Sequence, residues 1–276
     1  MLQFGILGLA PLHFLALPPL HLMAMLLVAS LLAGFVDAVV GGGGLITIPA
    51  LMLGLPAGTP ITTILGTNKV VACTGTTFAA GQFLRARVIR WQEMVLPVVC
   101  AMGGAAVGVA LAYFLSGRYE SMFRPGMLVL MLAMLAFTLL RPDIGKLHAP
   151  RHALGHQRAL AAGISALLGF YDGFFGPGTG SILIFLFVAV LGFDFLRASA
   201  LSKSVNWASN IASLCLFVAR GSWLPMVAIT MAMANGVGGS LGARTALAKG
   251  SGWVRVMFIG VVLALVLRLG WQMLRG

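Results

Sequence analysis

Charged residues are scarce in this sequence, and acidic residues are the scarcest of them. Only 9% of the 276 residues are charged, and Asp and Glu together number 6. An ordinary soluble domain carries about 25% charged residues, so this composition excludes a typical soluble globular protein. The formal net charge of +12 does not indicate a nucleic-acid partner, because the basic residues lie mostly between apolar stretches, where they are typical of the ends of membrane-spanning helices.

Metal-ligating residues are equally sparse. The three cysteines lie in apolar stretches and form no CxxC or other ligand spacing, which indicates neither a disulfide framework nor a zinc site. His148, His152 and His156 recur every four residues, but Pro150 lies among them and no cysteine or acidic ligand joins them. This pattern favours a solvated loop over a metal site. We therefore expect no metal and no cofactor.

Apolar residues dominate instead: 60% of the chain is hydrophobic and its mean hydropathy is +1.02. This composition predicts an all-α, polytopic membrane protein, since a helix needs about 20 apolar residues to cross a bilayer. Two of the apolar stretches, 45–55 and 180–193, are too short for this and follow glycine-rich breaks. We expect them to be half-helices, re-entrant segments or the second arms of broken helices. The ten apolar stretches are 20–36, 45–55, 61–84, 92–115, 125–140, 158–175, 180–193, 198–218, 223–247 and 253–273.

A repeated motif divides the chain into two halves. GFVDAVVGGGG starts at Gly34 and GFYDGFFGPGTG starts at Gly169, and Lys69 and Lys203 occupy matching positions after them. The pattern predicts a first transmembrane repeat at 20–140, a polar basic linker at 141–157 and a second repeat at 158–274. With about five hydrophobic segments, an odd number, each half is expected to be inverted relative to the other, as in many secondary transporters.

The glycine breaks are candidate parts of a binding site. Glycine destabilises a continuous helix by roughly 1 kcal/mol relative to alanine, but it lets the backbone approach a ligand and offer free N–H groups. Transporters of this kind place such helix starts near the membrane midplane, facing an anion. The alternative is that the glycines serve close helix packing. The candidate glycines are Gly41, Gly42, Gly43 and Gly44 in the first half and Gly176 and Gly178 in the second.

Lys69 and Lys203 are expected to supply positive charge to this site. A lysine in the middle of a membrane helix costs about 2.5 to 3.5 kcal/mol on insertion scales, so two at equivalent positions indicate a function. Nearby hydroxyl and amide groups are candidate hydrogen-bond donors to an oxyanion. The alternatives are that the lysines extend to the membrane surface or pair structurally with an aspartate. The candidate donors are Thr67, Asn68, Ser202, Asn206 and Asn210.

Asp37 and Asp172 precede the two breaks. They are candidates for proton coupling, for helix capping or for pairing with a lysine. An aspartyl dyad that shares a proton, as in an intramembrane protease, is a remote alternative, because only the YD of Tyr171 and Asp172 matches such a pattern. We therefore expect no catalytic residues and no enzyme.

The sequences GFVDAVVGGGGLITIPALMLGL and LGTNKVVACTGTTFAAGQFLRARVIRW, with GFYDGFFGPGTG in the second half, resemble the sulfite exporter TauE/SafE family of bacterial membrane proteins. The resemblance covers most of the chain. It implies transport, with export as the expected direction, of sulfite, a sulfonate or an organosulfonate such as sulfoacetate across the bacterial inner membrane. It also carries Pro177 into the site, together with residues already named in both halves. The second half departs from the first by having ALSKS where the first has GTNK.

The sequence therefore predicts a multi-pass secondary transporter of a small anion that works by alternating access. A passive anion channel is the alternative. The expected partners are the anionic substrate and the lipid bilayer. Two small-residue patterns, Gly104 with Gly108 and Gly238 with Gly242, favour close helix packing within the chain or between protomers, and so leave a homodimer open.

Overall fold

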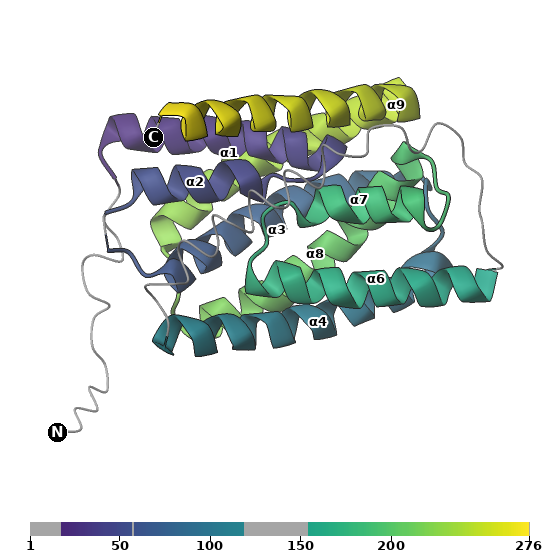
Figure 1. Ribbon diagram of the computed structural model, residues 1–276, viewed down its shortest axis with the longest axis horizontal. Coiled ribbons are helices and arrows are strands. Elements are labelled where there is room, and N and C mark those ends of the chain that lie inside the picture. Colours follow the sequence, from purple (N-terminus) through teal and green to yellow (C-terminus); the bar gives the residue numbers. More distant parts are fainter. Residues whose placement is uncertain (1–17, 57, 119–153, 276) are drawn as a thin grey trace.

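The computed structural model describes residues 18–56, 58–118 and 154–275, and within them the chain is helical and contains no strand (Figure 1). The predicted segment 125–140 and most of the linker 141–157 lie outside these residues. Gly250 has the non-helical angles φ 75° and ψ −174°, so α9 consists of two helices that meet there. The helices are α1 Leu20–Val40, α2 Gly44–Gly54, α3 Ile61–Arg85, α4 Trp91–Arg118, α6 Leu154–Phe174, α7 Thr179–Ala189, α8 Phe195–Ala219 and α9 Pro225–Arg275.

Three of the described helices are long and apolar enough to cross a membrane: α1, the Trp91–Ser116 part of α4 and the Pro225–Gly250 part of α9. The apolar helices α2 and α7 have 11 residues each. At 1.5 Å per residue such a helix is about 16 Å long, roughly half of a hydrocarbon core. The two short stretches predicted from the sequence are therefore short helices that cannot cross a bilayer alone.

The chain reverses direction at each glycine break. α1 ends at Val40, Gly41 and Gly42 have φ values of +77° and +88°, and α2 then runs back beside α1 (Figure 1). α6 is followed by Gly176 and Gly178, with φ values of +99° and +82°, and α7 runs back in the same way. Residues with a side chain rarely adopt positive φ, whereas glycine does so freely. Each break is thus a turn between two helices and not a kink in one helix.

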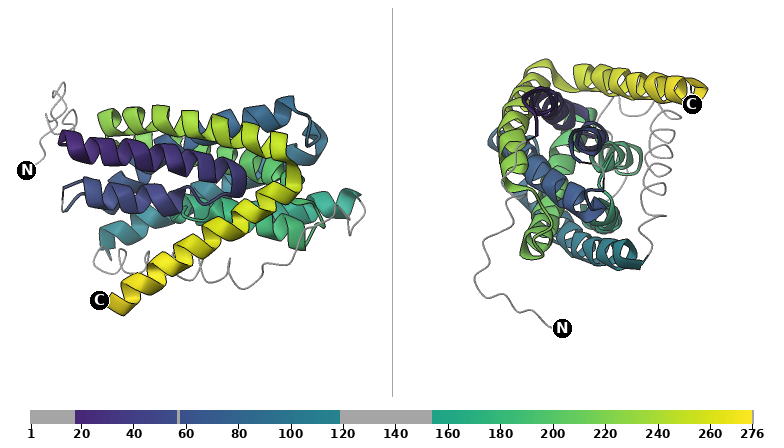
Figure 2. Two further views of the ribbon diagram at one scale, coloured as in Figure 1. Left: turned by 90° about the horizontal axis from the view of Figure 1, so that it is seen from above. Right: turned by 90° about the vertical axis from the view of Figure 1, so that its left-hand side faces the viewer.

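The helices pack into two bundles that do not coincide with the sequence halves. The first bundle is α1, α2, α3 and the Pro225–Gly250 part of α9, the second bundle is α4, α6, α7 and α8, and the two bundles meet where α3 packs against α8. Figure 2 shows α9 beside α1. Each bundle therefore combines three helices from one half of the sequence with one helix from the other half, which is α9 in the first bundle and α4 in the second.

Small residues make the closest of these contacts. A methyl group on Gly238 would lie 2.0 Å from the carbonyl oxygen of Leu31 in α1, and one on Gly104 would lie 2.1 Å from that of Ala166 in α6. Such distances are possible only without a side chain, and they let the helix backbones touch. The two small-residue patterns are therefore used for packing within the chain.

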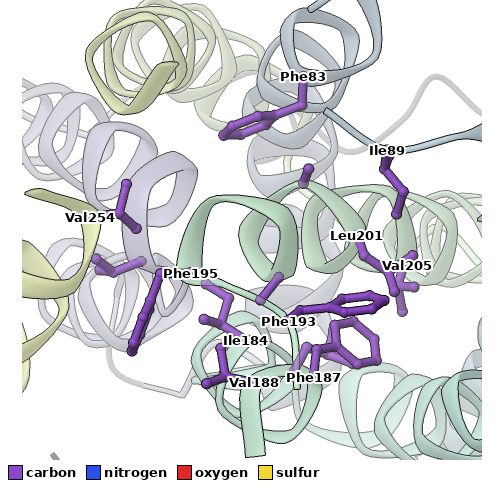
Figure 3. Close-up of a cluster of buried hydrophobic side chains, with 14 of the residues drawn as sticks. Phe83, Ile89, Ile184, Phe187, Val188, Phe193, Phe195, Leu201, Val205 and Val254 are labelled. Atoms are coloured by element: carbon purple, nitrogen blue, oxygen red, sulfur yellow. The ribbon is translucent and has the colours of Figure 1, made fainter. Parts of the chain in front are cut away.

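The short helices lie deep inside the bundles. Ile48 and Leu51 of α2 are fully buried and belong to a cluster with Leu26, Leu65 and Phe217. A second cluster surrounds α7, and Figure 3 shows Phe187, Phe193, Leu201 and Val205 together in it. Because both helices are enclosed by apolar side chains, their glycine-rich starts are held in the interior of the protein.

Candidate functional site

A small cavity lies where the starts of α2 and α7 meet. Figure 1 shows the two short helices end to end, with their first residues facing each other. At this junction Gly44 lies against Pro177, and Gly41 lies against the backbone of Gly180. The cavity has a volume of about 30 Å³, enough for one or two water molecules. Its lining is Asp37, Gly42, Gly43, Gly44, Thr47, Asn68, Lys69, Ala72, Asp172, Gly176, Gly178, Thr179, Gly180, Asn206, Asn210 and Asn235.

The starts of both short helices are uncapped. Gly43 and Gly178 occupy the cap positions and have no side chain to cap the helices, and neither first turn contains an acidic residue. The N–H of Gly43 itself donates to the Asp37 carboxylate. The first N–H groups of a helix have no partner within that helix, and together they carry a partial positive charge. Two such starts that face one cavity can bind an anion with backbone N–H groups.

Lys69 lies on α3 and reaches this cavity from the first half of the chain. Its Nζ lies 2.9 Å from the Asp172 carboxylate, donates to the Asp172 carbonyl oxygen at 2.6 Å and donates to Asn210 Oδ1 at 3.2 Å. The whole residue is 1% exposed. Asp172 Oδ2 also accepts from the Ser209 hydroxyl at 2.6 Å. A buried charge of this kind is tolerated because its partners replace water.

Lys203 lies on α8 and forms the matching pair. Its Nζ donates to Asp37 Oδ2 at 3.0 Å, and Asp37 Oδ1 accepts from the backbone N–H of Gly43 at 3.1 Å. Lys203 has a fully buried side chain, whereas the side chain of Asp37 is 16% exposed. Lys203 lies behind Asp37 and Gly180, outside the immediate cavity lining.

The two ion pairs are reciprocal. The lysine of each sequence half pairs with the aspartate of the other half, and each pair also joins the first bundle to the second. The structure therefore shows the pairing that the sequence offered as an alternative for both lysines. Each aspartate is paired with a lysine rather than with the other aspartate, which is not the arrangement of an aspartyl dyad.

The structure brings most of the predicted site residues to this cavity, but five lie outside its lining: Gly41, Thr67, Pro177, Ser202 and Lys203. Thr67 accepts a hydrogen bond from the N–H of Leu224 at 3.0 Å, before the start of α9. Ser202 donates to the carbonyl oxygen of Gly180 at 3.0 Å and so supports the second break from behind. Gly41 contacts Gly180 and lies outside the lining. Thr67, Ser202 and Gly41 position the site.

Sequence reasoning missed several lining residues, of which Thr47, Thr179 and Asn235 are polar and buried. The Thr47 hydroxyl lies at hydrogen-bond distance from Asn68 Oδ1 and from the Gly43 carbonyl oxygen. Asn235 donates to the carbonyl oxygen of Ser30 at 2.8 Å, and it is 4% exposed. A lone amide inside the apolar stretch 223–247 is the signal that would have found Asn235, because polar groups at membrane depth indicate a site.

No metal site emerges from the part of the chain that the structure describes: no group of three or more His, Cys, Asp or Glu side chains is placed to hold an ion there. His148 and His152 lie outside the described residues, and His156 lies near the start of α6. The expectation that the chain needs no metal stays a prediction.

Comparisons with known proteins identify relatives over most of the chain. Residues 26–269 match the family described as Sulfite exporter TauE/SafE. A protein named "Probable membrane transporter protein ORF9" of Sinorhizobium sp is 34% identical over 90% of this chain and 92% of its own length. "Probable membrane transporter protein YfcA" of Escherichia coli K12 is 34% identical over 86% of each chain.

A further relative, a "Probable membrane transporter protein" of Haemophilus influenzae, is 36% identical over 87% of this chain and 91% of its own length. No solved structure matches the chain. The apolar helices, the match over residues 26–269 and the coverage of these relatives agree. The chain is a membrane transporter and belongs to the sulfite exporter TauE/SafE family.

Proposed function

We propose that this protein is a secondary transporter that moves a small sulfur-containing oxyanion across the bacterial inner membrane, with export as the expected direction. Sulfite, a sulfonate or an organosulfonate such as sulfoacetate is the substrate class. The observation that carries the proposal is the cavity between two uncapped helix starts, with two buried lysines beside it.

The charge balance of the site favours an anion. Lys69, Asp37 and Asp172 line the cavity and Lys203 pairs with Asp37 beside it, so the formal charges of the two ion pairs cancel. Each helix start contributes roughly half a positive charge, and the two starts leave the empty site slightly positive. Neutral asparagine and threonine side chains complete the lining, and these can donate hydrogen bonds to oxyanion oxygens.

We further propose that residues 20–140 and 158–274 form inverted repeats that support alternating access. In Figure 1, α1 begins at the left and α6 begins at the right, while α2 and α7 also run in opposite directions. The reciprocal ion pairs agree with a twofold relation between the halves. The units that rock are then the two packed bundles, and the anion site lies between them.

Proton coupling through Asp37 or Asp172 is part of this proposal. Each carboxylate holds the ammonium group that an incoming anion would use. An anion that takes over the lysine leaves a buried carboxylate without its partner, which is costly unless the carboxylate takes up a proton. Anion and proton would therefore bind together.

Flux into proteoliposomes tests this function. The probes are labelled sulfite and labelled sulfoacetate, each with and without an imposed pH gradient. A secondary transporter gives saturable flux that the pH gradient drives against the anion gradient. A passive channel gives flux that follows the electrochemical gradient of the anion alone.

Protein-free vesicles, and vesicles carrying a variant with Lys69→Met and Lys203→Met together, provide the controls. No flux of either anion above these controls would exclude the proposed substrate class. Flux that the pH gradient leaves unchanged would exclude proton coupling.

A further inference from the structure

We propose that the two ion pairs, although equivalent in the repeat, have different roles. Lys203 with Asp37 is the pair that opens, so that Lys203 binds the anion and Asp37 takes up the coupling proton. Lys69 with Asp172 is a positioning pair that stays closed and holds the two bundles in register. This inference rests on the proposed anion transport, and it names the residue that binds the anion and the residue that takes up the proton.

The ammonium group of Lys69 has no donor to spare. An ammonium carries three N–H donors, and Lys69 has three acceptors within 3.2 Å: the Asp172 carboxylate, the Asp172 carbonyl oxygen and Asn210 Oδ1. An anion can bind Lys69 only by displacing one of them. Each displaced group is buried, so it would lose its hydrogen bond without gaining one to water.

Asp172 is held from a second direction. Its carboxylate accepts from Ser209 on α8, and Asn210 beside it donates to Asn206 Oδ1 at 3.3 Å. Asp172 is 3% exposed. Lys69, Asp172, Ser209 and the two asparagines therefore form one connected network across α3, α6 and α8, and opening the pair would disrupt the whole network.

Lys203 is bound far more loosely. Within the described part of the chain, its ammonium group has one hydrogen-bond acceptor, Asp37 Oδ2 at 3.0 Å. It lies against the start of α7, since a methyl group on Gly180 would come within 3.2 Å of Nζ. Its position between Asp37 and an uncapped helix start leaves N–H capacity for an anion that lies against α7.

Asp37 is also the more accessible carboxylate. It lines the cavity, and its side chain is 16% exposed, against 3% for Asp172. Among the residues that the structure describes, its hydrogen-bond partners are Lys203 and the backbone N–H of Gly43. Protonation of Asp37 weakens its interactions with the Lys203 ammonium group and with the Gly43 N–H, and these two groups can then donate to the anion.

The surroundings of Asp37 contain few other titratable groups. Lys203 faces it from α8, and the remaining titratable groups in the cavity wall are Lys69 on α3 and Asp172 on α6. The lining residues of α2, α7 and α9 are not titratable; they are Gly44, Thr47, Thr179, Gly180 and Asn235. A pH dependence of binding is thus assigned to one carboxylate between two ion pairs.

Matched variants of the two halves test the inference. The affinity for methanesulfonate is measured between about pH 5.5 and 8, a range in which the charge of this anion is constant. If one proton binds together with the anion, the affinity changes by up to about tenfold per pH unit. Wild-type binding should strengthen as the pH falls. Asp37→Asn should bind with nearly constant affinity, whereas Asp172→Asn should keep the wild-type slope. A flat profile for Asp172→Asn with a sloped one for Asp37→Asn would overturn the assignment.

A second measurement needs no ligand. The melting temperature of purified Lys69→Met should fall further than that of Lys203→Met, because the first change removes an ion pair and two hydrogen bonds to buried oxygens, whereas the second removes an ion pair with one hydrogen bond. Equal losses, or a larger loss for Lys203→Met, would contradict the inference. If wild-type protein binds neither methanesulfonate nor sulfite, the proposed function fails, while the melting temperatures still decide whether the two pairs differ.

Discussion

Gly41 is the residue at which the two glycine breaks touch. It has a φ of +77°, and a methyl group there would lie 2.3 Å from backbone atoms of Gly180 and Ser181. Any side chain at this position would therefore be strained and would also push the two helix starts apart. The function of this glycine is to let the two halves of the site meet.

Gly41→Ala should accordingly destabilise the protein by at least about 2 kcal/mol, from backbone strain and overlap together. Thermal unfolding in detergent measures the effect. Gly163→Ala is the control, because Gly163 lies inside α6 with nothing within 4 Å of an added methyl group, and it should stabilise by about 0.5 to 1 kcal/mol. Equal melting temperatures for the two variants would show that the breaks do not touch.

Thr47 tests the polar wall of the cavity. Thr47→Val keeps the shape of the side chain but removes the hydroxyl that serves Asn68 and Gly43. The Gly43 carbonyl oxygen keeps the backbone N–H groups of Ile46 and Thr47 as donors, but Asn68 Oδ1 loses the hydroxyl. Leaving this buried oxygen unpaired costs about 1 to 3 kcal/mol, and we expect weaker anion binding as well. Thr74→Val is the control, since its hydroxyl bonds to Val70 of its own helix at 3.1 Å and Thr74 lies outside the cavity lining. If both variants unfold and bind like wild type, Thr47 has no role in the site.

At the scale of elements, the adjacent glycines Gly103 and Gly104 of α4 allow the effect of helix packing on stability to be measured separately from the effect of helix propensity. A methyl group on Gly104 would lie 2.1 Å from the Ala166 carbonyl oxygen, whereas one on Gly103 would meet nothing within 4 Å. Gly104→Ala forces α4 away from α6 and should cost about 1 to 3 kcal/mol.

Gly103→Ala should be neutral or stabilise by up to about 1 kcal/mol, because alanine is the better helix former. The comparison is made by thermal unfolding of the two variants, which differ by one position. Equal effects would mean that α4 and α6 do not pack through this face.

The contacts between helices are the part of the fold that the sequence does not predict. The repeat aligns Lys69 with Lys203 and Asp37 with Asp172, and the length of the short stretches after the breaks predicts incomplete crossings. Which lysine meets which aspartate is a long-range contact that repetition alone does not determine. The packing of α4 on α6, and of α9 on α1, was equally hidden, because the apolar faces of these helices carry no signal that identifies a partner.

The glycine breaks were predicted as sites of interruption, and the sequence left open whether the chain continues past each one or reverses. Glycine permits positive φ without requiring it, so GGGG fits a kinked helix as well as the turn at Gly41 and Gly42. Lys203 shows a related limit. Its position in the repeat is equivalent to that of Lys69, but Lys69 donates two hydrogen bonds and Lys203 donates one within the described residues.

At the scale of the whole molecule, the two bundles should move as units. Spin labels at four exposed positions test this in a variant that lacks the three native cysteines. Leu20 and Val237 lie in the first bundle, and Phe114 and Leu167 lie in the second. These four sites give two pairs within bundles and four pairs between them, of which two join residues of the same sequence half.

Double electron–electron resonance measures the distance distribution of each pair. Leu20 with Val237, and Phe114 with Leu167, should give narrow distributions that sulfite and pH leave unchanged. Leu20 with Phe114, and Leu167 with Val237, each join the two bundles within one sequence half, and they should give broad distributions that shift with sulfite or with pH. If instead the pairs from one sequence half behave as rigid, the moving units are the halves and not the bundles.

The central claim is that the anion binds between the starts of α2 and α7. The most direct test is anomalous diffraction at the selenium edge from crystals soaked in selenite, a selenium oxyanion of the same shape as sulfite. The account predicts an anomalous peak in the cavity beside Gly44, Gly180 and the two lysines. Selenium peaks elsewhere in the protein, with none in this cavity, would contradict it.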